Sequence, residues 1–320
     1  MRRSTVAAVA GAALLAAARK IADAPPDPGV AARAEAASYS GPWTHGYATV
    51  NGVRLHYAEI GAGPLVVLLH GFPECWYTWH RLLPRLAERF HVIAPDMRGY
   101  NWSDKPPGVA SYKLDAVGHD IVSLIDAFGA ERAHIVGHDW GGSVAWHLGM
   151  FHPDRVDKLT VINAPHPVAF QREAFKSGQV LRSWYIFFFQ LPILPEAVAR
   201  LTLRQSLRGS AATPGAFSDE ALDIYQNGLS QPGAATAMLS YYRATFRDTA
   251  RLANQTRRTI DRPTLLIWGM RDVALSPQLT YDLDSWVPNL RVERVHDSGH
   301  WVPEERPTLV GNLLEEFLSA

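Results

Sequence analysis

Short apolar runs recur along the chain, and they constrain its fold more than any other feature. The run Leu65–Leu69 consists of five consecutive aliphatic residues. A strand of that length without polar alternation is buried on both faces, as in a parallel sheet covered by helices. The pattern therefore predicts an α/β fold, a mostly parallel sheet with helices on both faces. Related runs lie at His91–Ala94, His134–Val136, Leu159–Ile162, Thr264–Trp268 and Val292–Val295.

Three further segments complete the predicted organisation. Val53–Ile60 is predicted as an early strand after the turn at Asn51-Gly52, and Leu114–Phe128 as a helix. From about residue 168 to 254 there is no clear strand pattern, which predicts a helical lid inserted between two strands. The predicted units are an N-terminal segment with a linker (1–42), the first part of the core (43–167), a helical cap (168–255) and the second part of the core (256–320).

The N-terminus combines an apolar run with basic ends. Two arginines precede the Ala-rich run Val6–Ala18, and Arg19 and Lys20 follow it. The run is shorter than the about 20 residues of a spanning helix, but it resembles a secretory signal. Two interpretations stay open: a signal or tether, with membrane contact only through residues 1–20, or an appendage of a cytoplasmic protein. Residues 23–38, rich in Pro, Ala and Asp, predict a linker.

Composition excludes several classes of partner and cofactor. Lys plus Arg equals Asp plus Glu at 31 each, so no net charge recruits nucleic acid or an anionic membrane. The single Cys75 cannot form an intramolecular disulfide, and no Cys/His spacing suggests zinc. We expect neither a metal nor another cofactor.

The motif Gly137-His138-Asp139-Trp140-Gly141 lies between a predicted strand and the helix-like stretch Ser143–Met150. Small residues around a reactive one, on a strand-to-helix turn, are typical of an exposed nucleophile. A carboxylate that attacks an acyl carbon gives a high-energy anhydride, whereas attack on an sp³ carbon gives an ordinary ester that water can cleave. Asp139 therefore points to epoxides or alkyl halides. The alternative is that Asp139 only caps the following helix.

Two residues near the C-terminus fit a triad with Asp139. Asp272 follows the strand Thr264–Trp268, and His300 follows Val292–Val295. The carboxyl ends of parallel strands share one edge of a sheet, so both can reach Asp139. His300 would take a proton from water, and Asp272 would hold its tautomer and stabilise the imidazolium.

The loop His70-Gly71-Phe72-Pro73-Glu74 directly follows the buried run Leu65–Leu69. Its position is that of an oxyanion-binding loop, and the backbone N–H groups of Phe72 and Trp140 are the candidate donors. Pro73 has no N–H and is expected to fix the turn. His70 and Glu74 are interpreted as supports of the site.

These motifs, together with Ser298-Gly299-His300-Trp301, resemble the soluble epoxide hydrolases of the α/β-hydrolase superfamily, from about Trp43 to the C-terminus. The resemblance implies the same triad and two lid tyrosines that hold the epoxide oxygen. Ser183-Trp184-Tyr185-Ile186-Phe187-Phe188-Phe189-Gln190 matches the first tyrosine segment, and Ser240-Tyr241-Tyr242-Arg243 the second. The roles fall on Tyr185 and Tyr242. A phenol with a pKa of about 10 can protonate the alkoxide that an opening epoxide releases.

Two other functions remain open on the residues alone. A haloalkane dehalogenase shares the Asp nucleophile followed by Trp, but it usually has Asn where this chain has Phe72. A non-catalytic ligand-binding protein on a hydrolase scaffold would be expected to have lost one of the five catalytic candidates. The expected substrate is a small apolar epoxide, and the expected substrate-binding residues are Trp140, Trp184, Phe188 and Phe189.

Overall fold

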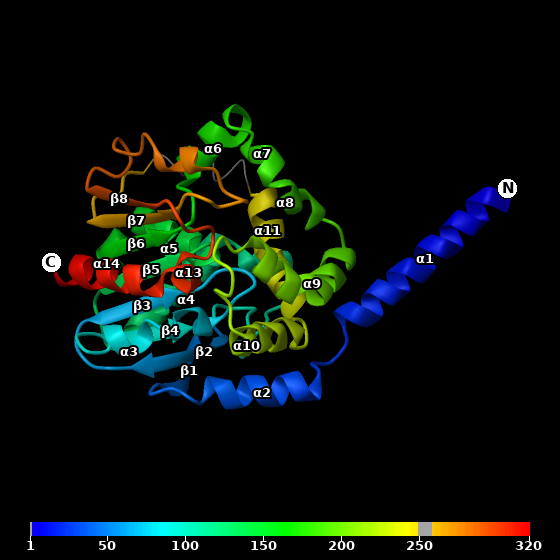
Figure 1. The fold of residues 1–320 in the computed structure, drawn as a ribbon, viewed down its shortest axis with the longest axis horizontal. Coiled ribbons are helices and arrows are strands. Elements are labelled where there is room, and N and C mark those ends of the chain that lie inside the picture. Colours follow the sequence, from blue (N-terminus) through cyan, green and yellow to red (C-terminus); the bar gives the residue numbers. More distant parts are fainter. Residues whose placement is uncertain (1, 249–257) are drawn as a thin grey trace.

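The computed structural model describes residues 2–248 and 258–320, and an eight-stranded sheet crosses it (Figure 1). The strand order is β1-β2-β4-β3-β5-β6-β7-β8. The pairings of β2 with β1 and β4 are antiparallel, and every pairing from β4 to β8 is parallel. The mostly parallel sheet predicted from the apolar runs is confirmed. The strands are β1 (Thr44–Val50), β2 (Val53–Ile60), β3 (Leu65–Leu69), β4 (His91–Pro95), β5 (Ala133–His138), β6 (Val156–Ile162), β7 (Thr264–Gly269) and β8 (Leu290–Val295).

Strand β1 is the one element of the sheet that the apolar pattern did not predict. It forms a hairpin with β2 across Asn51 and Gly52, whose φ angles of 51° and 73° suit a tight hairpin turn. It lies at the edge of the sheet, and most of its side chains are exposed or half-buried. An edge strand with a solvated face contains Gly, His and Thr in place of an aliphatic run. Its sequence therefore lacks the signal that marks the central strands.

Helices pack on both faces of the sheet. Two pairs contact each other and the sheet, α4 (Leu114–Ala127) with α5 (Trp140–Phe151), and α3 (Leu83–Leu86) with α14 (Pro307–Ser319). Helix α4 confirms the predicted helix, and Gly129 follows its end with a φ of 69°. Short helices complete the core: η1 (Trp76–Trp79), η2 (Val109–Tyr112), η3 (Pro153–Arg155), η4 (Pro277–Thr280) and α13 (Val302–Glu305).

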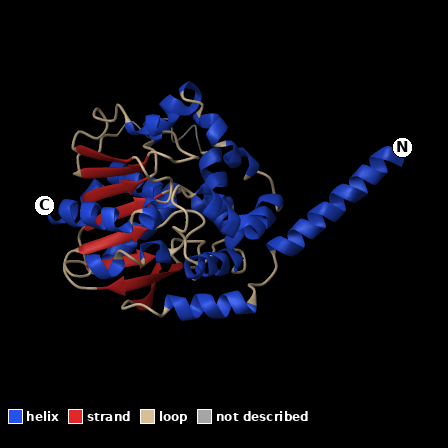
Figure 2. Ribbon diagram, viewed as in Figure 1, coloured by secondary structure: helices blue, strands red, loops and turns tan. Residues whose placement is uncertain are grey.

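The chain between β6 and β7 forms helices and, in its described part, no strand. These helices, here called the helical segment, contact η1 and η2, which lie in the loops after β3 and β4. The segment therefore covers the carboxyl edge of the sheet, to the right of the strands in Figure 2. The predicted cap boundary at residue 255 lies outside the described residues. The helices are α6 (Pro167–Lys176), α7 (Gln179–Arg182), α8 (Trp184–Phe188), α9 (Leu194–Ser210), α10 (Asp219–Ser230) and α11 (Ala234–Arg247).

The predicted linker over 23–38 is wrong for its second half, which forms helix α2 (Pro28–Ser38). The Asp27 carboxylate caps this helix by accepting the Val30 N–H at 2.9 Å. Helix α2 packs against α10, and its Arg33 donates to Asp223 at 2.5 Å. Its small alanines bury little apolar surface each, so composition alone suggested a segment with nothing to pack.

Helix α1 (Arg2–Ala22) projects away from the rest of the molecule (Figure 1). Its last turn contacts α9, where the Arg200 guanidinium donates to the carbonyls of Ala22 and Ala24. Among the described residues, no helix is both long and apolar enough to cross a membrane.

Candidate active site

The turn between β5 and α5 holds Asp139 in a strained backbone conformation, with φ 50° and ψ −115°. Glycines make the turn possible. A Cβ at Gly141 would lie 2.1 Å from the Leu69 carbonyl oxygen, and one at Gly137 would lie 2.2 Å from that of Gly141. Although Asp139 precedes α5, its carboxylate accepts no hydrogen bond from the first turn of that helix, all of which is described. The interpretation of Asp139 as a helix cap is wrong.

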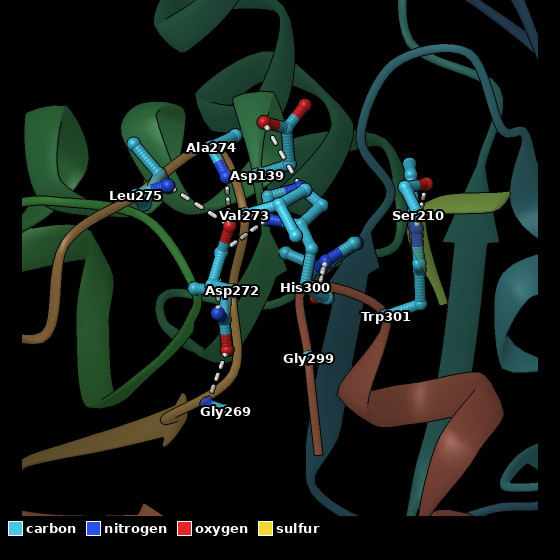
Figure 3. Close-up of polar contacts among 12 residues, drawn as sticks. Asp139, Ser210, Gly269, Asp272, Val273, Ala274, Leu275, Gly299, His300 and Trp301 are labelled. Carbon is cyan, nitrogen blue, oxygen red and sulfur yellow. Dashed lines mark hydrogen bonds and ion pairs between the residues drawn. The ribbon is translucent and has the colours of Figure 1, made fainter. Parts of the chain in front are cut away.

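The imidazole of His300 lies between two carboxylates (Figure 3). Its Nδ1 is 2.6 Å from Oδ2 of Asp272, and its Nε2 is 3.6 Å from Oδ2 of Asp139. The three residues follow β8, β7 and β5, so parallel strands bring them to one edge of the sheet. The structure thus brings together the three residues that the sequence predicts as a triad.

Asn163, which follows β6, fixes the acid of this group and was not found from the sequence. Its Nδ2 donates to Oδ2 of Asp272 at 2.7 Å, and its Oδ1 accepts the Gly269 N–H at 2.8 Å. The other oxygen of Asp272 accepts the N–H groups of Ala274 and Leu275 at 2.8 and 2.9 Å. The only available signal was a polar residue at the end of a predicted strand.

These contacts set the charges of the group. Burial lowers the pKa of His300, but the charges of Asp272 and Asp139 and the bonds to them outweigh it, and the net pKa lies well above the usual value. Burial would raise the pKa of Asp139, but His300, His138 and the Phe72 N–H together hold it below its usual value. The resting site therefore contains an imidazolium between two carboxylates.

The loop after β3 aims a backbone donor at the nucleophile. The Phe72 N–H donates to Oδ1 of Asp139 at 2.9 Å, and the Phe72–Pro73 peptide bond is cis. His70 shapes the loop, because its Nε2 accepts the Met97 N–H at 3.1 Å and its Nδ1 therefore donates to the Gly71 carbonyl at 3.0 Å. The N–H of Trp140 begins α5 and has no acceptor within that helix.

Glu74 supports the site through His138. Its Oε2 lies 3.0 Å from Nδ1 of His138, whose Nε2 lies 2.9 Å from the His300 carbonyl oxygen. Behind them, Glu304 is buried and accepts the Tyr225 hydroxyl at 2.7 Å. Burial, and then the charge of Glu74, raises the pKa of Glu304 to about 8. Glu74, which holds His138, is thus close enough to a second buried carboxyl group for the charge of one to raise the pKa of the other.

Two phenols from the helical segment lie close to Asp139. The rings of Tyr185 in α8 and Tyr242 in α11 are 5.9 Å apart and nearly perpendicular. Burial, and then the charge of Asp139, raises the pKa of both hydroxyls above the ordinary value, so both keep their protons. The neighbouring Tyr241 faces elsewhere, and its hydroxyl donates to the Arg98 carbonyl at 2.9 Å.

Arg243 connects the two tyrosine-bearing helices, and sequence reasoning did not assign it a role. Its guanidinium donates to the carbonyls of Phe189 at 2.9 Å and Leu191 at 2.7 Å, in the chain that leaves α8. It also pairs with Glu196 at 2.8 Å, and both side chains are buried. Because Arg243 directly follows Tyr242, it links the backbone at one tyrosine to the backbone just beyond the other.

The predicted substrate-binding residues divide into two groups. Phe189 lies against Tyr242 at a ring separation of 4.9 Å, and Trp140 lies at the same separation from Tyr242. Trp184 is 63% exposed and does not join them, which corrects its assignment to substrate binding. Phe188 is half-buried and lies between Trp184 and Phe189 in the same aromatic run. These residues are neighbours in the sequence, but successive residues of a helix point to different sides, so only some of them face the site.

The assembled site has a carboxylate, an imidazole, a backbone N–H donor and two protonated phenols around one point. It can attack an electrophilic carbon, protonate a leaving oxygen and activate water. In the described parts of the chain, no group of three or more His, Cys, Asp or Glu side chains is placed to hold a metal ion.

Comparison with known proteins agrees with this geometry. Residues 64–307 match the model of the alpha/beta hydrolase fold family. The AB hydrolase superfamily protein YfhM of Bacillus subtilis (strain 168) is 42% identical over 280 residues, covering 85% of this chain and 96% of that protein. Epoxide hydrolase 4 of Mus musculus is 34% identical over 290 residues, covering 86% and 79%. The fold and these matches define an α/β-hydrolase.

Solved structures narrow the class. An epoxide hydrolase from Bacillus megaterium, solved as a mutant with a naphthyloxy-propanediol product, has a TM-score of 0.77 at 30% identity and covers 86% of this chain and 100% of its own. Epoxide Hydrolase A from Mycobacterium thermoresistibile has a TM-score of 0.78 at 29% identity, covering 87% and 98%. The chain belongs to the epoxide hydrolase family of the α/β-hydrolase superfamily.

Proposed function

We propose that this protein hydrolyses apolar epoxides to vicinal diols through an ester on Asp139. The observation that carries the proposal is the pair of protonated phenols, Tyr185 and Tyr242, near a carboxylate that makes no capping hydrogen bond to its helix. A hydrolase that attacks acyl groups needs no such proton donors. A haloalkane dehalogenase needs none either, because a halide leaves without protonation.

In the first half-reaction, an oxygen of Asp139 attacks an epoxide carbon and the carbon–oxygen bond breaks. The released oxygen takes a proton from Tyr185 or Tyr242, which leaves a phenolate and a hydroxyalkyl ester of Asp139. The Asp139 carboxylate is thereby neutralised. The charge of Asp139 is one of those that raise the pKa of His300. When the ester removes this charge, the imidazolium can give its proton to the phenolate, which restores the phenol and makes His300 a base.

In the second half-reaction, His300 takes a proton from water and the resulting hydroxide attacks the ester carbonyl. The N–H groups of Phe72 and Trp140 would stabilise the oxyanion. The alkoxide leaves with the proton held by His300, and the acid proton left on Asp139 then passes to His300, which restores the resting carboxylate and imidazolium. Asp272, fixed by Asn163, stabilises the imidazolium during these steps.

The lining supports an apolar, aromatic-tolerant substrate. Phe72, Phe189 and Tyr242 form a cluster of perpendicular ring contacts beside the nucleophile. The helical segment would act as the cap that closes the site from water. The Bacillus megaterium relative, whose solved complex contains an aryloxy-propanediol, supports the same class of substrate.

The experiment is the double variant Tyr185→Phe/Tyr242→Phe, which removes both hydroxyls and keeps nearly all of the apolar shape. General-acid catalysis contributes roughly 100- to 10,000-fold, so we expect diol formation from an aryl epoxide to fall by at least the lower figure. Tyr241→Phe is the matched control, since its hydroxyl bonds a backbone carbonyl and not the substrate. Near-wild-type turnover in the double variant would contradict the proposal, and faster halide release from bromoalkanes by the wild type would favour a dehalogenase.

A further inference from the structure

Helices α6 to α8 expose large apolar side chains on their outer side. Single exposed apolar residues are ordinary, but a group of aromatic and aliphatic side chains within one short stretch marks an interaction surface. Helices α6 and α7 lie at the upper border of the molecule, and α8 continues from them toward α9 (Figure 1). The group, here called the outer patch, consists of Phe175, Leu181, Trp184, Phe187 and Leu191, which are 87%, 79%, 63%, 52% and 47% exposed.

The charges within the stretch of chain that bears the outer patch are of one sign. From Ala174 to Pro195 the chain contains no Asp or Glu, and its two charged residues, Lys176 and Arg182, are both exposed. The end of α11 extends the same character, because the exposed Phe246 lies 5.7 Å from the Phe187 ring and the exposed Arg247 follows it.

The nearest acidic side chains in the sequence on either side do not offset these cations. Glu173 pairs with Arg172 at 2.9 Å and its side chain is only 13% exposed. Asp248 lies 3.4 Å from Lys113, and its side chain is 22% exposed. Asp282, which comes from another part of the chain, lies 3.9 Å from Arg172 of α6. The stretch from Ala174 to Pro195 itself is apolar and basic, even though the whole chain has no net charge.

We propose that the outer patch docks the protein on the surface of an anionic phospholipid bilayer. Trp, Phe and Leu side chains insert at the boundary between headgroups and acyl chains, and Lys and Arg beside them bind anionic headgroups. A second copy of this chain fits the patch less well. In a twofold dimer the same patch meets itself, so Lys176 and Arg182 would face like charges with no acid from either copy's patch.

The docked face is the back of the helix that carries part of the candidate site. Tyr185 and Phe189 lie on the inner side of the same turn that exposes Trp184 and Phe187. Docking would therefore place the candidate site one helix away from the lipid bilayer, in which apolar epoxides dissolve. This consequence rests on the proposed function, whereas the docking itself does not.

The test is flotation of the full chain with vesicles, one set of phosphatidylcholine and phosphatidylglycerol in equal parts and one of phosphatidylcholine alone. We expect the wild type to float with the mixed vesicles and to bind the neutral ones more weakly. Phe175→Ser/Leu181→Ser should lower binding to the mixed vesicles at least roughly tenfold, because two apolar side chains no longer insert. Lys176→Glu/Arg182→Glu should abolish the preference for the anionic lipid.

Three controls separate this surface from the rest of the molecule. Leu309→Ser changes an exposed leucine of α14, on the sheet, and should leave flotation unchanged. Leu14→Ser/Leu15→Ser alters helix α1, and full flotation should again remain. Diol formation from a dissolved epoxide should be equal in all variants, so a failure of the proposed reaction would not be read as a failure of docking.

The proposal would be overturned if wild-type protein did not float with either vesicle. It would also be overturned if the α1 variant lost flotation while the outer-patch variant kept it, since α1 would then be the membrane contact. Light scattering measures the oligomeric state and tests whether a second copy of the chain covers the patch. A wild-type dimer that becomes monomeric in Phe175→Ser/Leu181→Ser, without vesicle binding, would show that a second copy covers the patch.

Discussion

The candidate site is shared by two regions that hold their residues in different ways. On the sheet, Asp272 is buried and accepts three hydrogen bonds besides that of His300. In the helical segment, the Tyr185 hydroxyl has no hydrogen-bond partner within residues 2–248 and 258–320, and its helix exposes aromatic side chains on its other side. In the proposed mechanism, the sheet side fixes the groups of ester hydrolysis, and the helical side supplies the acids of ring opening. We infer that damage to each region should slow a different half-reaction.

Among changes outside the reacting groups, the largest effect should come from the sheet side, at Asn163. Asn163→Asp keeps the size and suits the positive φ of 41°, but it replaces a donor 2.7 Å from Asp272 with a negative charge. That charge raises the pKa of His300 further and keeps it protonated, so ester hydrolysis at neutral pH should slow at least roughly tenfold. Stopped-flow measurement should show that its pH profile moves upward while alkylation changes little. An unchanged pH profile would contradict the role given to Asn163.

The corresponding change in the helical segment is Arg243→Lys. Lysine can keep the ion pair with Glu196 but cannot bond the carbonyls of Phe189 and Leu191 at the same time. The tyrosine pair should lose its alignment, and alkylation should slow roughly tenfold while ester hydrolysis keeps its rate. Arg247→Lys, at an exposed position of the same helix, is the control. Equal slowing of both half-reactions would remove the distinction between the two regions.

The next effect concerns stability of the helical segment, which α2 supports from outside. Arg33→Ala removes a donor to the carboxylate of Asp223, which also accepts from Arg204. Because the arginine is largely exposed, we expect only a small loss in the free energy of unfolding by urea. Deletion of residues 1–38 should cost more, since it also uncovers the surface of α10. A truncated protein as stable as the full chain would show that α2 contributes nothing.

The last of these effects concerns the pH dependence of stability, through Glu304→Gln. The folded pKa of Glu304, about 8, lies above its ordinary value of 4.5, so the folded state binds more protons between these pH values. Wild-type stability should therefore decrease as pH rises from about 5 to 8. The glutamine can still accept from Tyr225 and has no charge to bury, so its stability should depend less on pH. Thermal unfolding across this range measures the difference, and parallel curves would refute the assignment.

The sequence was most informative at positions where the structure admits only a few residue types. Fully buried strands such as Leu65–Leu69 and the turn at Asp139 could be predicted, because burial on both faces and a strained turn restrict composition. Asn163 and Arg243 could not, because their roles depend on partners far away in the chain.

Errors arose where composition did not determine packing. Helix α2 buries alanines that look like a linker. Trp184 was assigned wrongly, because it faces solvent. The five residues of α8 are all aromatic or aliphatic, so their sequence does not reveal which side of the helix points inward. The edge strand β1 shows the same limit, since its solvated face admits polar residues and glycine.

The central claim is that Asp139 forms an ester with the substrate and that His300 directs water to cleave it. Incubation of His300→Gln with an aryl epoxide, followed by peptide mass spectrometry, tests it most directly. Ring opening should continue while hydrolysis nearly stops, so an adduct with the mass of the epoxide should accumulate on the peptide that contains Asp139. With active wild-type enzyme as reference, the absence of an adduct, or its location on another peptide, would contradict the account.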